Sequence, residues 1–82
     1  MSLALSKEEF EEKCMDVIEK IVGTDIHWDR AKAIEVSQKM VEKAKAKTSN
    51  QEVISIYERV VKEFKIATDA EYNLLKKQIF GS

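Results

Sequence analysis

The 82 residues make one small domain, 1–82, that buries only roughly 60% of the surface of its unfolded chain, which leaves little room for a deep catalytic cleft. Because 14 basic residues face 15 acidic ones, with a formal charge of −1, no overall field selects nucleic acid, an anionic membrane or a charged substrate. A single cysteine, Cys14, and a single histidine, His27, exclude an intrachain disulfide and a zinc site of cysteines and histidines within one chain.

The chain opens with MSLALSKEEFEE, which lacks the basic start of a signal peptide. No apolar run approaches the roughly 20 residues that a membrane span needs, so we expect a cytoplasmic protein without a membrane span. Proline is absent, and no segment alternates apolar and polar residues as a half-buried strand would. The sequence therefore predicts an all-α fold, an antiparallel four-helix bundle with helices at about 7–22, 25–47, 50–65 and 69–80.

The first predicted helix carries one apolar stripe at helical spacing, formed by Phe10, Cys14, Val17, Ile18, Ile21 and Val22. Ser6 and Glu9 have the spacing of a capping box, in which each side chain bonds the backbone N–H of the other residue. Gly23 is expected to end this helix in the left-handed conformation, which glycine adopts without steric cost.

The stretch TDIHWDR, residues 24–30, follows Gly23 and leads into the apolar pattern of the second helix, so Thr24 or Asp25 is the expected N-cap. Trp28 has two interpretations. It could close the end of the bundle against a neighbouring loop, or it could belong to an exposed contact surface, where tryptophan is often a binding hot spot.

The same stretch raises the question of a metal site or an active site. Asp25, His27 and Asp29 alternate in sequence as metal ligands could, but on a helix residues 25 and 29 share a face while 27 points elsewhere. His27 as a catalytic base needs a nucleophile, and Cys14 belongs to an apolar stripe, where a thiol behaves as a small buried hydrophobe. We therefore expect no metal, no cofactor and no enzymatic activity.

The second helix also carries a basic stripe, Lys39, Lys43 and Lys47, spaced four residues apart. Such a stripe could follow the phosphates of a nucleic acid, or face an anionic membrane surface or an acidic partner. It could also simply complement the negative end of the helix dipole.

The third predicted helix begins at a second capping box, Ser49-Asn50-Gln51-Glu52, and continues with Val53, Tyr57, Val60, Val61 and Phe64 on one face. Beyond Phe64 the pattern has two interpretations. A third capping box, Thr68 with Glu71, would end one helix and begin a fourth, whereas an unbroken helix from about 50 to 80 would protrude and pair with a second copy. We favour the break, four helices and a monomer, and a homodimer remains the alternative.

The stretch IYERVVKEFKIATDAEYNLLKKQIF, residues 56–80, resembles the class IIa bacteriocin immunity proteins of lactic acid bacteria. In that family the third helix ends in a Lys-Ile-like pair, and a Thr-x-x-Glu helix start and a leucine-containing fourth helix follow. The matching residues here are Lys65, Ile66, Thr68, Glu71, Leu74, Leu75 and Ile79. The acidic first helix and the lysine-rich second helix are also similar, whereas many members carry a longer C-terminal tail.

The resemblance implies a non-enzymatic bundle in the producer's cytoplasm that protects the cell by engaging the mannose permease that the bacteriocin has locked open. We interpret the apolar residues that fit the helical stripes least well as a candidate binding surface, together with the basic stripe: Trp28, Ile66, Leu74, Phe80, Lys39, Lys43 and Lys47. Two alternatives stay open. One is a small helical adaptor or regulatory protein that acts by protein–protein association, and the other is nucleic-acid binding through the basic residues between Arg30 and Lys47.

Overall fold

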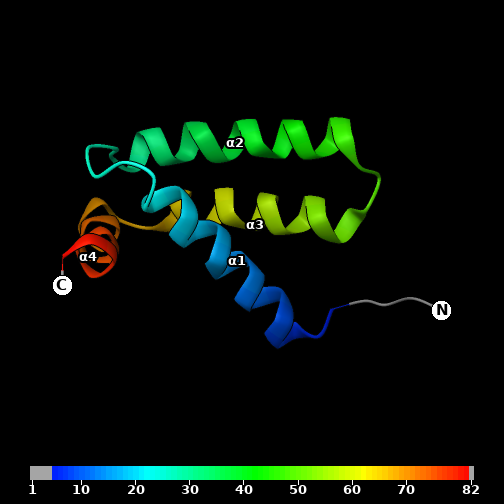
Figure 1. Cartoon of the computed structure of the whole chain (residues 1–82), viewed down its shortest axis with the longest axis horizontal. Coiled ribbons are helices and arrows are strands. Elements are labelled where there is room, and N and C mark those ends of the chain that lie inside the picture. Colours follow the sequence, from blue (N-terminus) through cyan, green and yellow to red (C-terminus); the bar gives the residue numbers. More distant parts are fainter. Residues whose placement is uncertain (1–4, 82) are drawn as a thin grey trace.

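A computed structural model describes residues 5–81, which form four helices: α1 (Lys7–Val22), α2 (Arg30–Lys47), α3 (Gln51–Ile66) and α4 (Asp69–Phe80). Figure 1 shows α2 and α3 side by side and antiparallel, α1 crossing beside them, and α4 seen nearly end-on at one end of the molecule. The predicted all-α four-helix bundle is confirmed. The alternative of one helix from about 50 to 80 is wrong, because α3 ends at Ile66 and α4 begins at Asp69.

The core lies where α1, α2 and α3 meet and where α4 closes one end. The buried side chains of α2 are all small, Ala33, Ser37 and Ala44, and such side chains allow α3 to pack closely against it. From α4 the buried residue is Tyr72, whose ring meets Phe64 of α3 edge-on at 6.0 Å. In the described part of the chain, no helix combines the length and the apolar composition needed to cross a membrane.

The predicted apolar stripes are confirmed in α1 and only partly in α3. Helix α1 buries Cys14, Ile18, Ile21 and Val22, all from its predicted stripe. Helix α3 buries Val60 and Phe64 as expected, but it also buries Ile54 and Ile56, which lie outside the predicted stripe. Because α1 and α2 both pack against α3, its buried arc is wider than one stripe.

Two of the predicted capping boxes are present. The Oγ of Ser6 accepts the Glu9 N–H at 3.2 Å, and the Glu9 carboxylate accepts the Ser6 N–H at 3.1 Å. Thr68 and Glu71 repeat this exchange at 3.0 and 2.8 Å at the start of α4. These two boxes fix where α1 and α4 begin.

The capping box predicted for α3 is wrong. Asn50, and not Ser49, is the N-cap, and its side-chain oxygen accepts the Glu52 N–H at 2.9 Å. The Glu52 carboxylate is therefore free for a distant partner, the backbone N–H of Leu5, which donates to it at 2.6 Å. This bond ties the segment before α1 to the start of α3.

The predicted start of α2 at residue 25 is also wrong. Asp29 is the N-cap and accepts the Lys32 N–H at 2.9 Å, so α2 begins at Arg30. Asp25 instead closes a turn: its carboxylate accepts the His27 N–H at 2.8 Å, and its carbonyl accepts the Trp28 N–H at 3.1 Å.

Gly23 ends α1, but not in the predicted left-handed conformation. Its φ of −78° and ψ of −2° are right-handed. A Cβ at this position would lie 2.9 Å from the Glu19 carbonyl oxygen and 3.5 Å from the Ile79 side chain of α4. Glycine therefore fits here because a side chain would meet close neighbours. The backbone conformation itself does not require glycine.

Candidate protein-binding groove

An apolar groove opens between α1, the end of α3 and α4, with a volume of about 340 Å³. The buried side chains of Ile18, Phe64 and Tyr72 lie along it, and Leu75 of α4 is half-buried there. Two apolar side chains at its border are exposed: Met15 of α1, at 46%, and Ile66 of α3, at 64%. Exposed apolar surface that gathers around a hollow is typical of a binding site.

The groove continues between α1 and α3 into a second hollow of about 280 Å³, which shares Met15, Ile18 and Glu63 with the first. Glu11 and Arg59 border this extension. On α1 the combined groove runs from Glu11 to Ile18, about two helical turns or roughly 10 Å. We call both hollows together the α1–α3–α4 groove.

Carboxylates dominate the border of the α1–α3–α4 groove. Glu11, Glu63 and Glu71 line it, and Arg59 is the basic residue found among the described side chains that line it. The Nε of Arg59 donates to the Glu63 carboxylate at 2.8 Å, and this bond raises the pKa of the guanidinium. Arg59 therefore already has an acidic partner within the chain. The pair cancels its own charge, so the remaining charged side chains among the described residues that line the groove are the carboxylates of Glu11 and Glu71.

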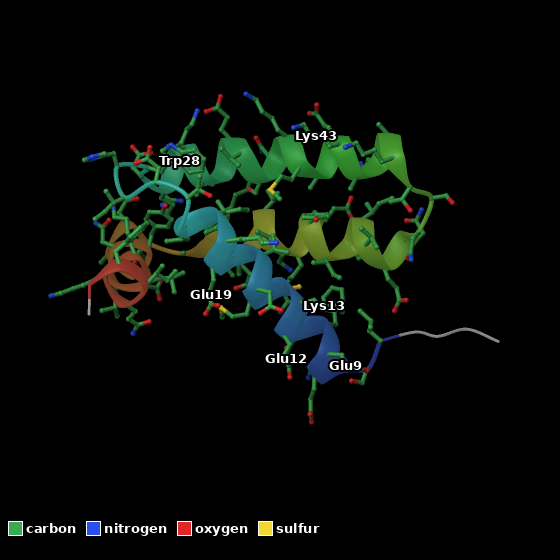
Figure 2. The ribbon with its side chains drawn as sticks, in the orientation of Figure 1. Glu9, Glu12, Lys13, Glu19, Trp28 and Lys43 are labelled. Atoms are coloured by element: carbon green, nitrogen blue, oxygen red, sulfur yellow. The ribbon has the colours of Figure 1, made fainter. Side chains whose placement is uncertain are left out.

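Those carboxylates form a row beside the exposed Met15. Glu8, Glu11, Glu12 and Glu19 are exposed, and helical spacing places them on the side of α1 that Met15 occupies. Figure 2 shows Glu12 and Glu19 projecting from the same side of α1, with Lys13 on the other side of the ribbon. Within residues 5–81, none of the four carboxylates takes part in an ion pair.

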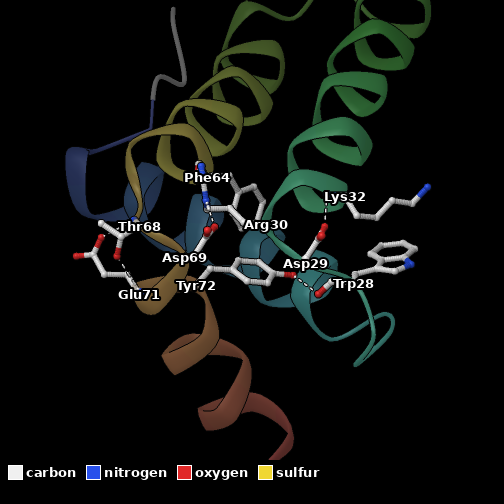
Figure 3. A network of polar contacts seen from close by, with 9 residues as sticks. All are labelled: Trp28, Asp29, Arg30, Lys32, Phe64, Thr68, Asp69, Glu71 and Tyr72. Atoms are coloured by element: carbon white, nitrogen blue, oxygen red, sulfur yellow. Dashed lines mark hydrogen bonds and ion pairs between the residues drawn. The ribbon is translucent and has the colours of Figure 1, made fainter.

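The angle between α3 and α4, which opens the groove, is held by Arg30 at the start of α2. Its Nη1 donates to the Phe64 carbonyl in the last turn of α3 at 3.2 Å, and its Nε donates to Asp69 at the start of α4 at 2.7 Å (Figure 3). One side chain therefore binds the end of one helix and the beginning of the next.

Trp28 holds α4 from the other side. Its backbone carbonyl accepts the hydroxyl of Tyr72 at 3.2 Å (Figure 3). The same carbonyl accepts the ammonium of Lys76 at 3.3 Å. Its ring is half-buried and packs against the core, with the ammonium of Lys32 5.9 Å from the ring centre. Burial, and then the charge of Asp29, raise the pKa of Tyr72, so its hydroxyl stays a donor at neutral pH.

The basic stripe lies over a different depression, between α2 and α3. Lys43 and Lys47 border this hollow of about 310 Å³, together with Met40, Val53 and Tyr57. Lys39 instead pairs with Glu35 on its own helix at 3.6 Å. Three lysines that form one stripe in sequence thus split between an ion pair and a shallow hollow.

The structure does not bring the predicted surface residues into one place. Ile66 borders the α1–α3–α4 groove, and the exposed Leu74 lies three residues after Glu71 and so beside it on α4. Phe80 lies about 120° from Leu74 around α4, and Trp28 sits half-buried at the end of the bundle, as the end-closing interpretation expects.

Sequence reasoning missed Met15 and the carboxylates of the groove. The signal was present in α1, where Met15 stands outside the apolar stripe and is flanked at helical spacing by Glu11, Glu12 and Glu19. The sequence alone could not assign Met15 to a groove, because most of the other residues that line it come from α3 and α4.

The residues considered for metal binding and catalysis are not assembled. Among residues 5–81, no group of three or more His, Cys, Asp or Glu side chains could hold a metal ion. Cys14 is buried against the Ile56 carbonyl, and burial raises the pKa of its thiol, whereas His27 is exposed in the turn before α2.

Comparison with known proteins gives no match: no protein-family model, no curated protein and no solved structure matches this chain. The fold and the geometry of the groove are therefore the observations from which function is inferred.

Proposed function

We propose that the chain is a non-enzymatic cytoplasmic immunity protein of the class IIa bacteriocin type, which protects its producer by engaging the mannose permease that the toxin has locked open. The observation that carries this proposal is the α1–α3–α4 groove, with Met15 and Ile66 exposed at its border and Leu74 exposed beside it. A protein that acts by binding another protein needs such a surface, and exposed apolar side chains that gather around a hollow are typical of one.

The resemblance of residues 56–80 to that family supports the same proposal. Its distinguishing elements, the Lys65-Ile66 pair, the helix start at Thr68 and Glu71, and Leu74 and Leu75, form the junction between α3 and α4. Ile66, Glu71 and Leu75 line the groove. The part of the chain that carries the resemblance therefore supplies the α3 and α4 side of the groove.

Survival of a sensitive bacterium tests the proposal. The chain is expressed in a strain that carries the mannose permease, the strain is challenged with a panel of class IIa bacteriocins, and its survival is compared with an empty-vector strain. We expect protection against at least one toxin. Absence of protection against the whole panel, with the protein shown to be folded and abundant, would contradict the proposal.

Variants connect protection to the groove. Replacing Met15 and Ile66 with Gln removes exposed apolar surface that lines the groove, and we expect protection to be lost while the helical content stays unchanged. Ile26→Gln with Phe80→Gln is the matched control, because these apolar side chains are also exposed but lie outside the groove. Equal loss in both pairs would mean that the groove is not the protecting surface.

The same groove also fits a helical adaptor or regulatory protein, which would bind a different partner through it. An adaptor would keep its groove and give no protection in the survival assay. The two functions therefore differ in the first experiment and share the surface on which they depend.

A further inference from the structure

We infer that the occupant of the α1–α3–α4 groove is a cationic amphipathic helix of a partner protein. Its apolar side chains would fill the groove, and its lysines or arginines would lie beside the carboxylates of α1. The inference deepens the proposed function, on which it rests for the choice of a protein partner, because it names the chemistry of that partner.

The shape of the groove favours a helix over an extended peptide. An extended peptide gains affinity by adding a strand to the free edge of a sheet, and the groove is bordered by three helices, whose backbone groups already bond within each helix. A helix binds through side chains alone. Two turns of groove along α1 match apolar residues spaced three and four positions apart on the occupant.

The charges of the border favour a cationic occupant. Glu11 lines the groove, and Glu8, Glu12 and Glu19 lie beside Met15 at the outer edge of the same side of α1. All four are without ion-pair partners in the described part of the chain. Arg59, the basic residue at the border, is already bonded to Glu63. A cationic helix would supply the missing partners, whereas an anionic helix would place like charges beside this row.

A second copy of the chain is the competing occupant, since α2 carries Lys39, Lys43 and Lys47. Its exposed face, however, offers no large apolar side chain: those exposed among residues 5–81 are Met15, Ile26, Ile66, Leu74 and Phe80, and none belongs to α2. Helix α2 of a second copy would supply charge and leave the apolar groove unfilled. The structure therefore favours a partner that combines both properties on one helix.

Binding of designed peptides tests the inference. The probe is a fluorescein-labelled peptide of about 14 residues, roughly four turns, with leucines at helical spacing and lysines at the remaining positions. A second peptide has the same leucines and glutamates in place of the lysines. Fluorescence anisotropy at low salt should show binding of the cationic peptide, weaker binding as salt increases, and no comparable binding of the anionic peptide.

Charge-reversed variants locate the site. Glu11 lines the groove, and Glu19 lies one turn after Met15 on the same side of α1. In the pair Glu11→Lys with Glu19→Lys we expect the affinity for the cationic peptide to fall about tenfold or more. The control pair, Asp16→Lys with Glu42→Lys, makes the same change in net charge at exposed positions outside the groove and should bind as the unchanged protein does. Met15→Gln with Ile66→Gln should also lose affinity.

Three results would overturn the inference: no binding of the cationic peptide, equal binding of the anionic peptide, or equal losses in the groove variants and their controls. Light scattering tests the other occupant. A dimer that the Glu11→Lys and Glu19→Lys pair dissociates would assign the groove to a second copy and overturn the inference as well.

The failure of the inference and the failure of the proposed function remain distinguishable. A chain that binds the cationic peptide in the groove but gives no protection contradicts the immunity function and leaves the inference standing. If the chain protects, and its Glu11→Lys and Glu19→Lys pair protects equally well, the inference is contradicted and the immunity function stands.

Discussion

Arg30, the first residue of α2, holds its Nε 2.7 Å from the carboxylate of Asp69, the first residue of α4. The same guanidinium donates to the carbonyl of Phe64 at 3.2 Å. The last carbonyls of a helix have no partner within that helix, so Arg30 satisfies a group that α3 leaves open. Because α4 lines the groove, a contact that positions α4 also shapes the candidate site.

The two bonds of Arg30 should differ in their contribution to stability. Asp69→Asn removes the charge of a side chain that is 79% exposed, so it should lower the free energy of unfolding by less than about 1 kcal/mol. Arg30→Met also leaves the part-buried Phe64 carbonyl without this donor, and should lower it by about 1–2 kcal/mol. Urea denaturation measures both. Equal effects would mean that the bond to Phe64 contributes nothing.

Tyr72 should stabilise the fold mainly through its ring. Tyr72→Phe removes the hydroxyl that donates to the Trp28 carbonyl, but this carbonyl still accepts from Lys76. The free energy of unfolding should therefore fall by only about 0.5–1.5 kcal/mol. Tyr72→Ala empties a buried site and should lower the free energy of unfolding by about 3–5 kcal/mol. Thermal unfolding followed by the fluorescence of Trp28 compares them, and similar losses would show that the hydrogen bond dominates.

The capping box of α4 should matter for the separation of α3 from α4. Thr68→Ala removes the side chain that accepts the Glu71 N–H, at an expected loss of about 1 kcal/mol. Thr68→Ser keeps the acceptor and is the control, with a smaller expected loss. Chemical denaturation gives the free energies. If both variants unfold alike, the hydroxyl is not what stabilises the start of this helix.

The capping box of α1 predicts a dependence on acid pH. Two hydrogen bonds lower the pKa of Glu9 below its usual 4.5. The larger effect comes from the backbone N–H of Ser6, and the smaller one from the Ser6 side chain. A carboxyl with a lowered pKa in the folded state stabilises the fold above its unfolded pKa, and this contribution is lost as pH falls through the folded value.

The variant Glu9→Gln cannot titrate, so the loss of stability between neutral pH and pH values below 4.5 should be smaller than in the unchanged protein. Thermal unfolding at a series of pH values measures the difference. Parallel curves for the two proteins would show that the Glu9 carboxylate does not stabilise the folded chain.

Sequence reasoning placed three of the helices well because the signals are local. The capping boxes of α1 and α4 each need two residues three positions apart, and both are recognisable without any tertiary contact. The start of α2 was misplaced because Thr24, Asp25 and Asp29 are all good N-cap residues. The structure favours Asp29, since the Trp28 carbonyl accepts bonds from Tyr72 and Lys76 of α4.

The sequence by itself determined that the chain is all-α and where α1, α3 and α4 run, because periodicity and capping depend on residues within a few positions of one another. Only the tertiary structure decided that Met15, Ile66 and Glu71 border one groove while Trp28, Phe80 and the lysines of α2 lie elsewhere. These positions depend on how the helices pack, and the packing of α4 is fixed by Arg30 and Trp28, more than thirty residues away in the chain.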